Sequence, residues 1–148
     1  MPAYSKKDQV KPKIKKKKPK NLLTPLENKL DKLWSLKVKE LAGYACEYCG
    51  KDTTLNSHHI YSRSKKSVRW CLLNGVCLCV SHHTFSSTFS AHKTPAEFID
   101  WIELNRGVTW LIGLKTEANK ISDKITVEYL QDLIDAYGSP KKKVHSED

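Results

Sequence analysis

The 148-residue chain has the length of one ordinary domain, and its formal net charge is +10. Beyond a lysine-rich N-terminal segment, too little chain remains for a second full hydrophobic core, so we expect one domain with tails. No run of about 18 apolar residues occurs and no apolar segment follows the first lysines, which excludes a transmembrane helix and a signal peptide. We therefore expect a soluble, intracellular protein that does not bind membranes.

The positive charge is concentrated at the N-terminus. Residues 1–20 hold nine lysines against one aspartate, a balance of +8, which leaves +2 for residues 21–148. Because this segment has three prolines and few apolar residues, we expect a disordered tail that contacts the DNA backbone nonspecifically. The lysines that we assign to this contact are Lys13, Lys15, Lys16, Lys17 and Lys18. A solubility or localisation segment is the alternative.

Apolar spacing predicts a first helix over residues 25–41. Thr24 followed by Pro25 is typical of a helix start, with the threonine as N-cap and proline at the first helical position. Apolar residues then recur every three or four positions as far as Leu41, which predicts one buried helix face. Gly43 follows and is expected to end the helix.

Residues 44–92 contain all five cysteines and most of the histidines. Here we expect a strand at 54–60, a polar and basic loop at 61–74, a second strand at 75–79 and a helix from Val80 onward. This order is a ββα element with a long loop between its strands. Loops beyond about 12 residues are uncommon and often functional, so this loop favours an active site.

Two further helices are expected, over 95–106 and 126–137, each followed directly by a glycine. Thr94 and Pro95 repeat the N-cap and proline signal at the start of the first. Both helices should cover the metal-binding core. Residues 139–148 are expected to form a polar C-terminal tail.

Two pairs of metal-ligating residue types are separated by 29 intervening residues. Cys46 and Cys49 form a CxxC knuckle, and Cys79 and His82 form the second pair with the same two-residue gap. Together they supply the four sulfur and nitrogen ligands of a closed tetrahedral zinc site. We therefore predict one structural Zn²⁺ bound by these residues. Reduced cysteines that merely pack in the core are the alternative.

Further polar residues between and after these pairs resemble the signature of the HNH endonuclease family. His58 and His59 precede an isoleucine, Asn74 follows in the loop, and His83 comes directly after the second zinc pair. The resemblance covers about residues 44–92 and looks like the zinc-containing branch, in a family abundant in bacteriophages and mobile elements. It implies an α+β fold with a small, treble-clef-like ββα-metal core, crosslinked by the structural zinc and flanked by helices.

The resemblance also implies a role for each of these residues. His59 is the general base that activates water, His58 and His83 bind a catalytic divalent metal, and Asn74 holds the loop and the base in place. Alternation along a strand agrees with different roles for the adjacent histidines, because neighbouring side chains point to opposite faces. Many family members have aspartate at the position of His58. The exchange weakens the case for Mg²⁺ and admits Mn²⁺, Ni²⁺ or Zn²⁺.

Basic residues of the predicted loop are candidates for DNA contacts, and Arg63 is the best placed to hold the scissile phosphate. These residues are Arg63, Lys65, Lys66 and Arg69. His92 is a further candidate for a metal or phosphate contact, with a cap or surface contact as the alternative.

We therefore expect a metal-dependent DNA endonuclease whose nuclease domain spans residues 21–138. The alternative is a zinc-dependent nucleic-acid-binding module without catalysis. Such a module would not need a second histidine beside His58 or beside His82, and this surplus of histidines favours the enzyme. The oligomeric state, the catalytic metal and the specificity for a DNA sequence or structure are not determined by these patterns.

Overall fold

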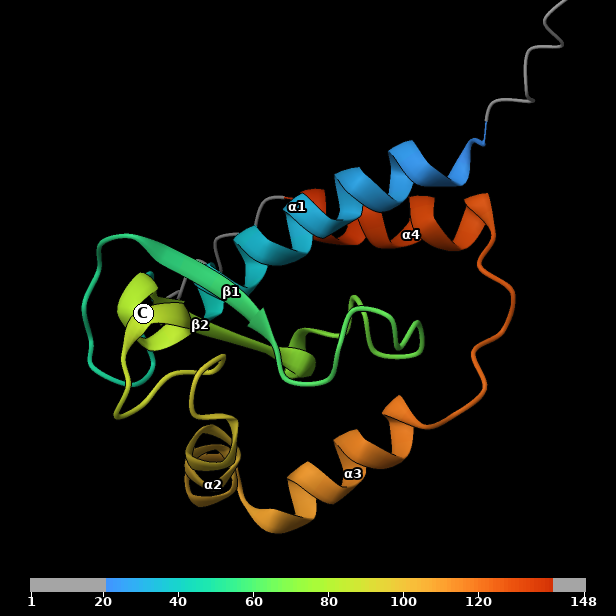
Figure 1. Cartoon of the computed structure of the whole chain (residues 1–148). Helices are drawn as coiled ribbons and strands as arrows, with labels where there is room; N and C mark the ends of the chain where they lie inside the picture. Colours follow the sequence, from blue (N-terminus) through green and yellow to red (C-terminus); the bar gives the residue numbers. More distant parts are fainter. Residues whose placement is uncertain (1–20, 140–148) are drawn as a thin grey trace, which may run out of the picture.

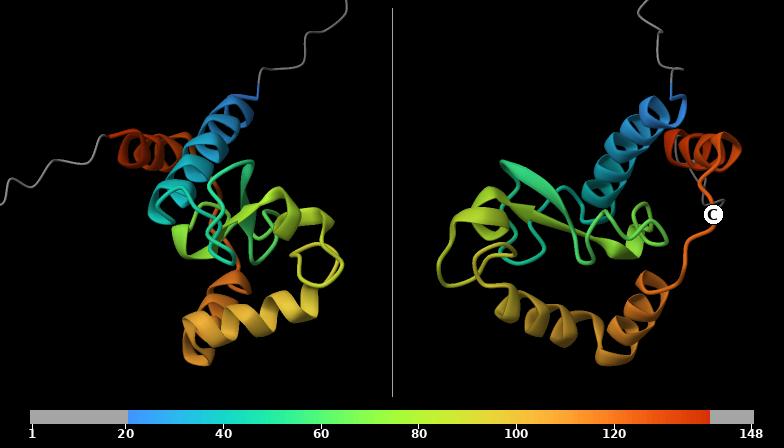
Figure 2. Two further views of the ribbon diagram at one scale, coloured as in Figure 1. Left: turned by 90° about the vertical axis from the view of Figure 1, so that its left-hand side faces the viewer. Right: turned by 45° about the vertical axis from the view of Figure 1, so that its right-hand side comes forward.

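The computed structural model describes residues 21–139, so the predicted lysine-rich tail and residues 140–148 lie outside the described residues. In the described part, four α-helices surround a two-stranded sheet, which confirms a mixed α+β fold. The helices are α1 (Leu23–Leu41), α2 (Pro95–Arg106), α3 (Val108–Ala118) and α4 (Val127–Gly138). Helices α1 and α4 lie on one side of the sheet, and α2 and α3 lie on the other (Figures 1 and 2). Within residues 21–139, no helix is long and apolar enough to span a membrane.

The sheet consists of β1 (Leu55–His59) and β2 (Gly75–Cys79), which pair antiparallel. The predicted second strand is confirmed, and the first is one residue shorter at each end than predicted. Every residue of β2 is buried, because both faces of the strand are covered. Val76 and Leu78 pack on the side of α2, whereas Cys77 packs on the side of α1, as the alternation of a strand requires.

Helix α1 packs on the sheet through residues four positions apart, which share one helix face. These buried residues are Leu30, Trp34 and Val38. Leu130 and Ile134 of helix α4 pack with these residues in one hydrophobic cluster. Helix α4 therefore covers α1, whereas we expected it to cover the metal-binding core. Helix α1 approaches β2 so closely that a Cβ atom on Gly75 would clash with Val38. The glycine at the start of β2 therefore permits this packing.

Helix α2 covers the other face of the sheet, as expected. Its buried residues Phe98 and Ile102 join the cluster that contains Val76 and Leu78. Helix α3, which the sequence analysis did not predict, follows α2 after a single glycine, Gly107, with a positive φ of 89°. Glycine adopts this backbone conformation without the steric cost that a Cβ would add.

The predicted helix start at Thr24 is wrong, whereas Thr94 is the N-cap residue of α2 and Pro95 its first residue, as predicted. Thr24 lies inside α1, and the Asn21 side chain instead accepts a hydrogen bond from the Leu23 amide (3.1 Å). The Thr94 hydroxyl bonds with the backbone of Ser90, both as acceptor (2.8 Å) and as donor (3.1 Å). The Thr94 hydroxyl therefore does not cap the first turn of α2, although the Thr94 carbonyl accepts from the Phe98 amide (3.0 Å).

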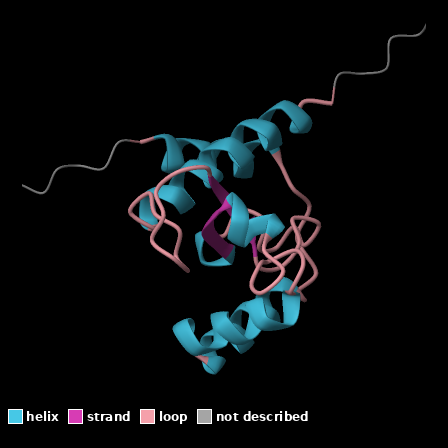
Figure 3. Ribbon diagram, turned by 60° about the vertical axis from the view of Figure 1, so that its left-hand side comes forward, coloured by secondary structure: helices cyan, strands magenta, loops and turns pink. Residues whose placement is uncertain are grey.

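The helix expected from Val80 onward is a single π-helical turn, η2 (Ser81–Phe85). A loop connects this turn to α2 (Figure 3). The helical member of the expected ββα element is therefore only five residues long.

The long loop between the strands is present and ends in a 3₁₀ turn, η1 (Leu72–Asn74). It was expected to be a polar and basic loop. However, Val68, Arg69 and Trp70 are buried in it, because α1 and α3 supply neighbours that cover them.

Candidate metal centres

Cys46, Cys49, Cys79 and His82 each bring one sulfur or nitrogen atom to within 4.8 Å of the others. The two sulfurs of Cys49 and Cys79 lie 3.9 Å apart, and Nδ1 of His82 lies 3.3 and 3.8 Å from the sulfurs of Cys79 and Cys46. Ligands of a tetrahedral zinc ion are separated by about 3.8 Å for two sulfurs and about 3.6 Å for sulfur and nitrogen. The four atoms therefore fit a zinc ion, and we call them the Cys₃His cluster.

Backbone turns present the first two sulfurs of this cluster. The Gly50 amide donates to the Cys46 carbonyl (2.7 Å), and Gly50 has a positive φ of 75° that suits glycine. Burial raises the pKa of the Cys46 thiol, but hydrogen bonds with the backbone of Cys79, Cys49 and Tyr48 bring it below its ordinary value. A lowered pKa favours the thiolate, which is the form that binds metal.

A second cluster contains only histidines. His58 on β1, His83 on η2 and His92 in the loop before α2 bring one ring nitrogen each to within 4.8 Å of one another, and we call them the His₃ cluster. The Nε2 atoms of His83 and His92 lie 3.2 Å apart, and the His58 ring lies 5.3 and 5.1 Å from the other two rings. The structure thus brings the predicted pair together and adds His92.

Backbone hydrogen bonds place His92 beside η2. The amides of Ala91 and His92 donate to the carbonyls of His82 (2.9 Å) and His83 (3.2 Å). The two clusters are therefore connected by adjacent residues and by the backbone. No regular spacing in the sequence predicts that His92 lies beside His83, because this contact forms only when the loop after η2 folds back onto η2.

Burial keeps two residues of the His₃ cluster, His58 and His83, uncharged. It lowers the pKa of His58 to about 3, with a further contribution from His83 and His92, and it lowers the pKa of His83, again with a contribution from His92. Neutral imidazole is the form that coordinates metal, and protons compete weakly for such a site near neutral pH. Three imidazoles without a carboxylate suit ions such as Zn²⁺ or Ni²⁺ better than Mg²⁺.

His59 points to the opposite face of β1 and is not part of either cluster. Its ring stacks on Trp34, with 3.8 Å between ring centroids and 7° between planes. Nε2 lies 2.8 Å from the carbonyl oxygen of Arg69. Because a carbonyl only accepts, Nε2 carries the proton and Nδ1 is left as the proton acceptor. Burial lowers the pKa of His59, which keeps the ring neutral near neutral pH.

Asn74 ties the two ends of the loop together from a fully buried position. Its side-chain oxygen accepts from the Tyr61 amide (2.8 Å), and its Nδ2 donates to the carbonyls of Tyr61 (2.9 Å) and Val68 (3.1 Å). Three hydrogen bonds from one buried amide fix the loop directly after β1, where His59 ends the strand.

Arg69 is placed differently from what the sequence predicted. Its side chain is 7% exposed, and Asp31 of α1 holds its guanidinium through Nε (3.1 Å) and Nη2 (2.7 Å). A guanidinium held in this way is not open to a phosphate, which argues against the prediction of Arg69 as a DNA contact.

The other predicted loop contacts are more exposed but also have partners. Arg63, 66% exposed, lies 3.3 Å from Asp31, and Lys66 pairs with Glu27 at 2.9 Å. Lys65 donates to an asparagine side chain on the α3 side. Exposed ion pairs of this kind contribute little to stability and exchange readily for a phosphate, so these residues stay candidates for DNA contacts.

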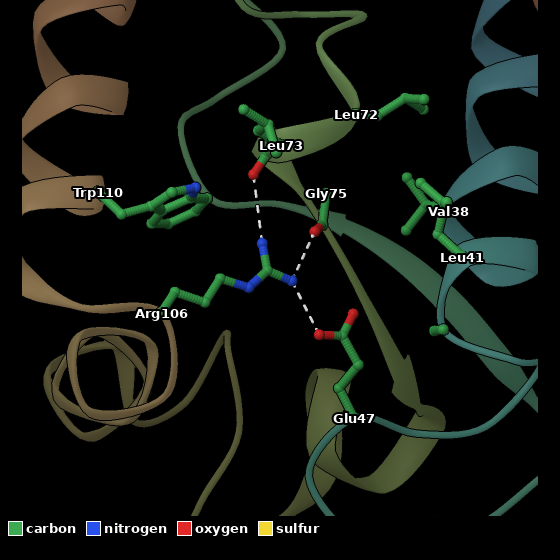
Figure 4. A pocket seen from close by; sticks show the side chains of 9 residues that line it. Val38, Leu41, Glu47, Leu72, Leu73, Gly75, Arg106 and Trp110 are labelled. Carbon is green, nitrogen blue, oxygen red and sulfur yellow. Dashed lines mark hydrogen bonds and ion pairs between the residues drawn. The ribbon is translucent and has the colours of Figure 1, made fainter.

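A cavity of about 390 Å³ lies away from both clusters, between α1, η1 and the junction of α2 with α3 (Figure 4). Arg106 reaches into it and donates to the carbonyls of Leu73 (3.3 Å) and Gly75 (3.1 Å) and to the carboxylate of Glu47 (2.8 Å). Its guanidinium also lies 5.1 Å from the centre of the Trp110 ring. With these contacts satisfied inside the chain, Arg106 links α2 to the sheet and does not offer a free cation to a ligand.

No protein-family model, curated protein or solved structure matches this chain.

Replacing His92 with alanine should weaken Ni²⁺ binding to the His₃ cluster by at least about 10-fold, because the loss of even an outer hydrogen-bond partner of a metal ligand costs about this much. Isothermal titration of the zinc-loaded protein with Ni²⁺ measures this. Lys93→Ala, which changes the next side chain, is the matched control and should leave the affinity at the parent value. Equal affinity in His92→Ala and the parent would show that His92 is not a ligand.

Proposed function

We propose that the protein is a metal-dependent DNA endonuclease of the HNH type, with a zinc-crosslinked ββα-metal core. The observation that carries this proposal is the separation of two adjacent histidines on β1. His58 joins the His₃ cluster, whereas His59 turns to the other face, where the Arg69 carbonyl orients its ring. Phosphodiester hydrolysis needs a metal-binding group and a base, and these two histidines supply both.

In this mechanism the base is Nδ1 of His59. The bond from Nε2 to the Arg69 carbonyl fixes the tautomer in which Nδ1 accepts a proton from the attacking water. Asn74 holds the loop that follows the base. A divalent ion on the His₃ cluster would stabilise the negative charge that develops on the phosphate. Arg63 and Lys65 would contact the DNA backbone at the edge of the loop.

The Cys₃His cluster has a structural role in the proposal. Four protein ligands close a tetrahedral zinc site and leave no open position for a substrate. His82 and His83 are adjacent, so a zinc ion on the first would hold the second in place for the His₃ cluster.

One incubation tests the enzyme against the alternative of a zinc-dependent nucleic-acid-binding module. Supercoiled plasmid is incubated with the zinc-loaded protein in Mg²⁺, Mn²⁺, Ni²⁺ or Zn²⁺, or with EDTA. We expect nicked or linear plasmid in at least one metal and none in EDTA. If plasmid stays supercoiled in every metal but its mobility shifts on a gel, the binding module is the better account, and the stacking of His59 on Trp34 is then ordinary packing.

Deleting residues 1–20 should flatten the salt dependence of DNA affinity. Residues 21–139 carry 14 basic and 13 acidic side chains, a balance of +1, whereas residues 1–20 carry +8. Phosphate contacts release counterions, so log K falls with log salt by about 0.9 per contact. Fluorescence anisotropy with a labelled duplex at several salt concentrations measures the slope. Deleting residues 140–148, with a balance of +1, is the control. Equal slopes for the tail deletion and the parent would exclude the tail as a DNA contact.

A further inference from the structure

We propose that Asp31 on α1 is a positioning residue for His59, and that it acts through Arg69. The inference rests on the proposed role of His59 as the base. The two carboxylate oxygens of Asp31 accept separate hydrogen bonds from Nε (3.1 Å) and Nη2 (2.7 Å) of Arg69. Two parallel bonds to a planar guanidinium fix its orientation as well as its distance. The backbone of Arg69 is thereby held at a set position beside α1.

His59 forms its hydrogen bond with the backbone of Arg69 and not with its side chain. The Arg69 carbonyl accepts from Nε2 of His59 at 2.8 Å. Arg69 therefore contacts two elements: its side chain bonds to Asp31 of α1, and its carbonyl bonds to His59. Asp31 lies 38 residues before Arg69, and Arg69 lies ten residues after His59. A helix outside the strands therefore determines where the base finds its hydrogen-bond acceptor.

The two loop residues after Arg69 are held in the same way. Nε1 of Trp70 donates to Oδ1 of Asp31 at 2.8 Å, and Nε1 of Trp34 donates to the carbonyl of Cys71 at 3.0 Å. Trp34 also stacks on the His59 ring. Helix α1 thus fixes three consecutive loop residues and the face of the base, which an ordinary surface ion pair does not do.

The Asp31 carboxylate is charged and contacts two arginines, Arg69 and Arg63. Burial raises the pKa of Asp31, but hydrogen bonds from Arg69 and Trp70 and the charge of Arg69 lower it below its ordinary value, so the group is charged near neutral pH. Arg63 approaches the same carboxylate from an exposed position at 3.3 Å. Arg63 can exchange Asp31 for a phosphate while the two hydrogen bonds between Asp31 and Arg69 stay in place.

Glu27 gives a matched comparison on the same helix. It lies one turn before Asp31, pairs with Lys66 at 2.9 Å and reaches Nη1 of Arg69 only at 3.7 Å. Asp31→Asn and Glu27→Gln each remove one negative charge from the side of α1 that faces the loop. Only Asp31→Asn removes the pair of charged hydrogen bonds to Arg69. The comparison therefore separates the effect of losing a negative charge from the effect of losing the position of Arg69.

The experiment uses the full chain with zinc bound and histidines labelled with ¹⁵N. In the parent we expect a resolved Nε2–H proton signal from His59, because an N–H proton that is hydrogen-bonded to a buried carbonyl exchanges slowly with water. Asp31→Asn should lose this signal by exchange, and Glu27→Gln should keep it. In plasmid cleavage, Asp31→Asn should lower kcat about 10-fold with KM within about two-fold, since a small misplacement of a catalytic group slows the chemical step.

Each result supports or overturns the inference. A protected Nε2–H in Asp31→Asn, or equal losses in both variants, would overturn it. If the parent cleaves no DNA but its Nε2–H is lost only in Asp31→Asn, the proposed function fails while the positioning of His59 by Asp31 stands. If Asp31→Asn does not fold, Arg69→Lys, which keeps the charge and removes the pair of hydrogen bonds, is measured for the same signal and the same kcat.

Discussion

Replacing His59 with alanine should lower the rate of DNA cleavage by at least ~10²-fold, the lower end of what a positioned general base contributes. Zinc content and DNA affinity should stay at the parent values, because His59 belongs to neither metal cluster. Loss of the ring that stacks on Trp34 should lower the melting temperature by only a few degrees. Single-turnover cleavage of plasmid in the best metal measures the rate, and elemental analysis measures the zinc.

His59→Gln separates the loss of the base from the loss of packing. The glutamine amide can still donate to the Arg69 carbonyl, but it does not take up a proton near neutral pH. This variant should therefore be as slow as His59→Ala. Cleavage at the parent rate by either variant would show that His59 is not the base, and the proposed mechanism would then fail.

Replacing Cys46 with alanine should remove the zinc of the Cys₃His cluster and destabilise the whole domain. Zinc binding is coupled to folding, so part of the folding free energy is lost with the ion. We expect a melting temperature lower by about 10 °C or more, since each lost kcal/mol shifts it by roughly 4 °C in a domain of this size. Elemental analysis should find about one tightly bound zinc per chain in the parent and much less in the variant.

Cys71→Ala is the matched control, because it also removes a thiol but lies outside the Cys₃His cluster. It should keep its zinc and melt close to the parent. If the parent itself, purified without chelator, contains no tightly bound zinc, the assignment of a structural zinc site is refuted.

Local sequence patterns predicted the strands and three of the four helices. Apolar residues at helical spacing, such as Leu30, Trp34 and Val38, define one face of α1 without reference to the rest of the chain. Helix α3 was missed because its apolar residues are not confined to its buried face. It buries Leu114 and Ala118, which are four positions apart, but it also exposes Val108 and Ile112, so no single apolar stripe stands out in its sequence.

The spacing of the metal-ligating residue types also determined much of the candidate site. Two-residue gaps bring Cys46 near Cys49 and Cys79 near His82, because short turns leave few other arrangements of the side chains. The alternation of a strand places His58 and His59 on opposite faces in the same way. These relations are local, so the sequence alone was enough to predict them.

Only the tertiary structure decided which distant residues meet these local groups. His92 reaches the His₃ cluster because the loop after η2 folds back, and no spacing rule predicts such a return. Arg69 was expected in solvent beside DNA, but Asp31 of α1, 38 residues away in the chain, buries and pairs it. The physical reason is the same in both cases. Burial and pairing of a polar side chain depend on which elements pack around it, and that packing is set by the apolar faces of α1, α2 and the sheet, not by the neighbours of the residue in sequence.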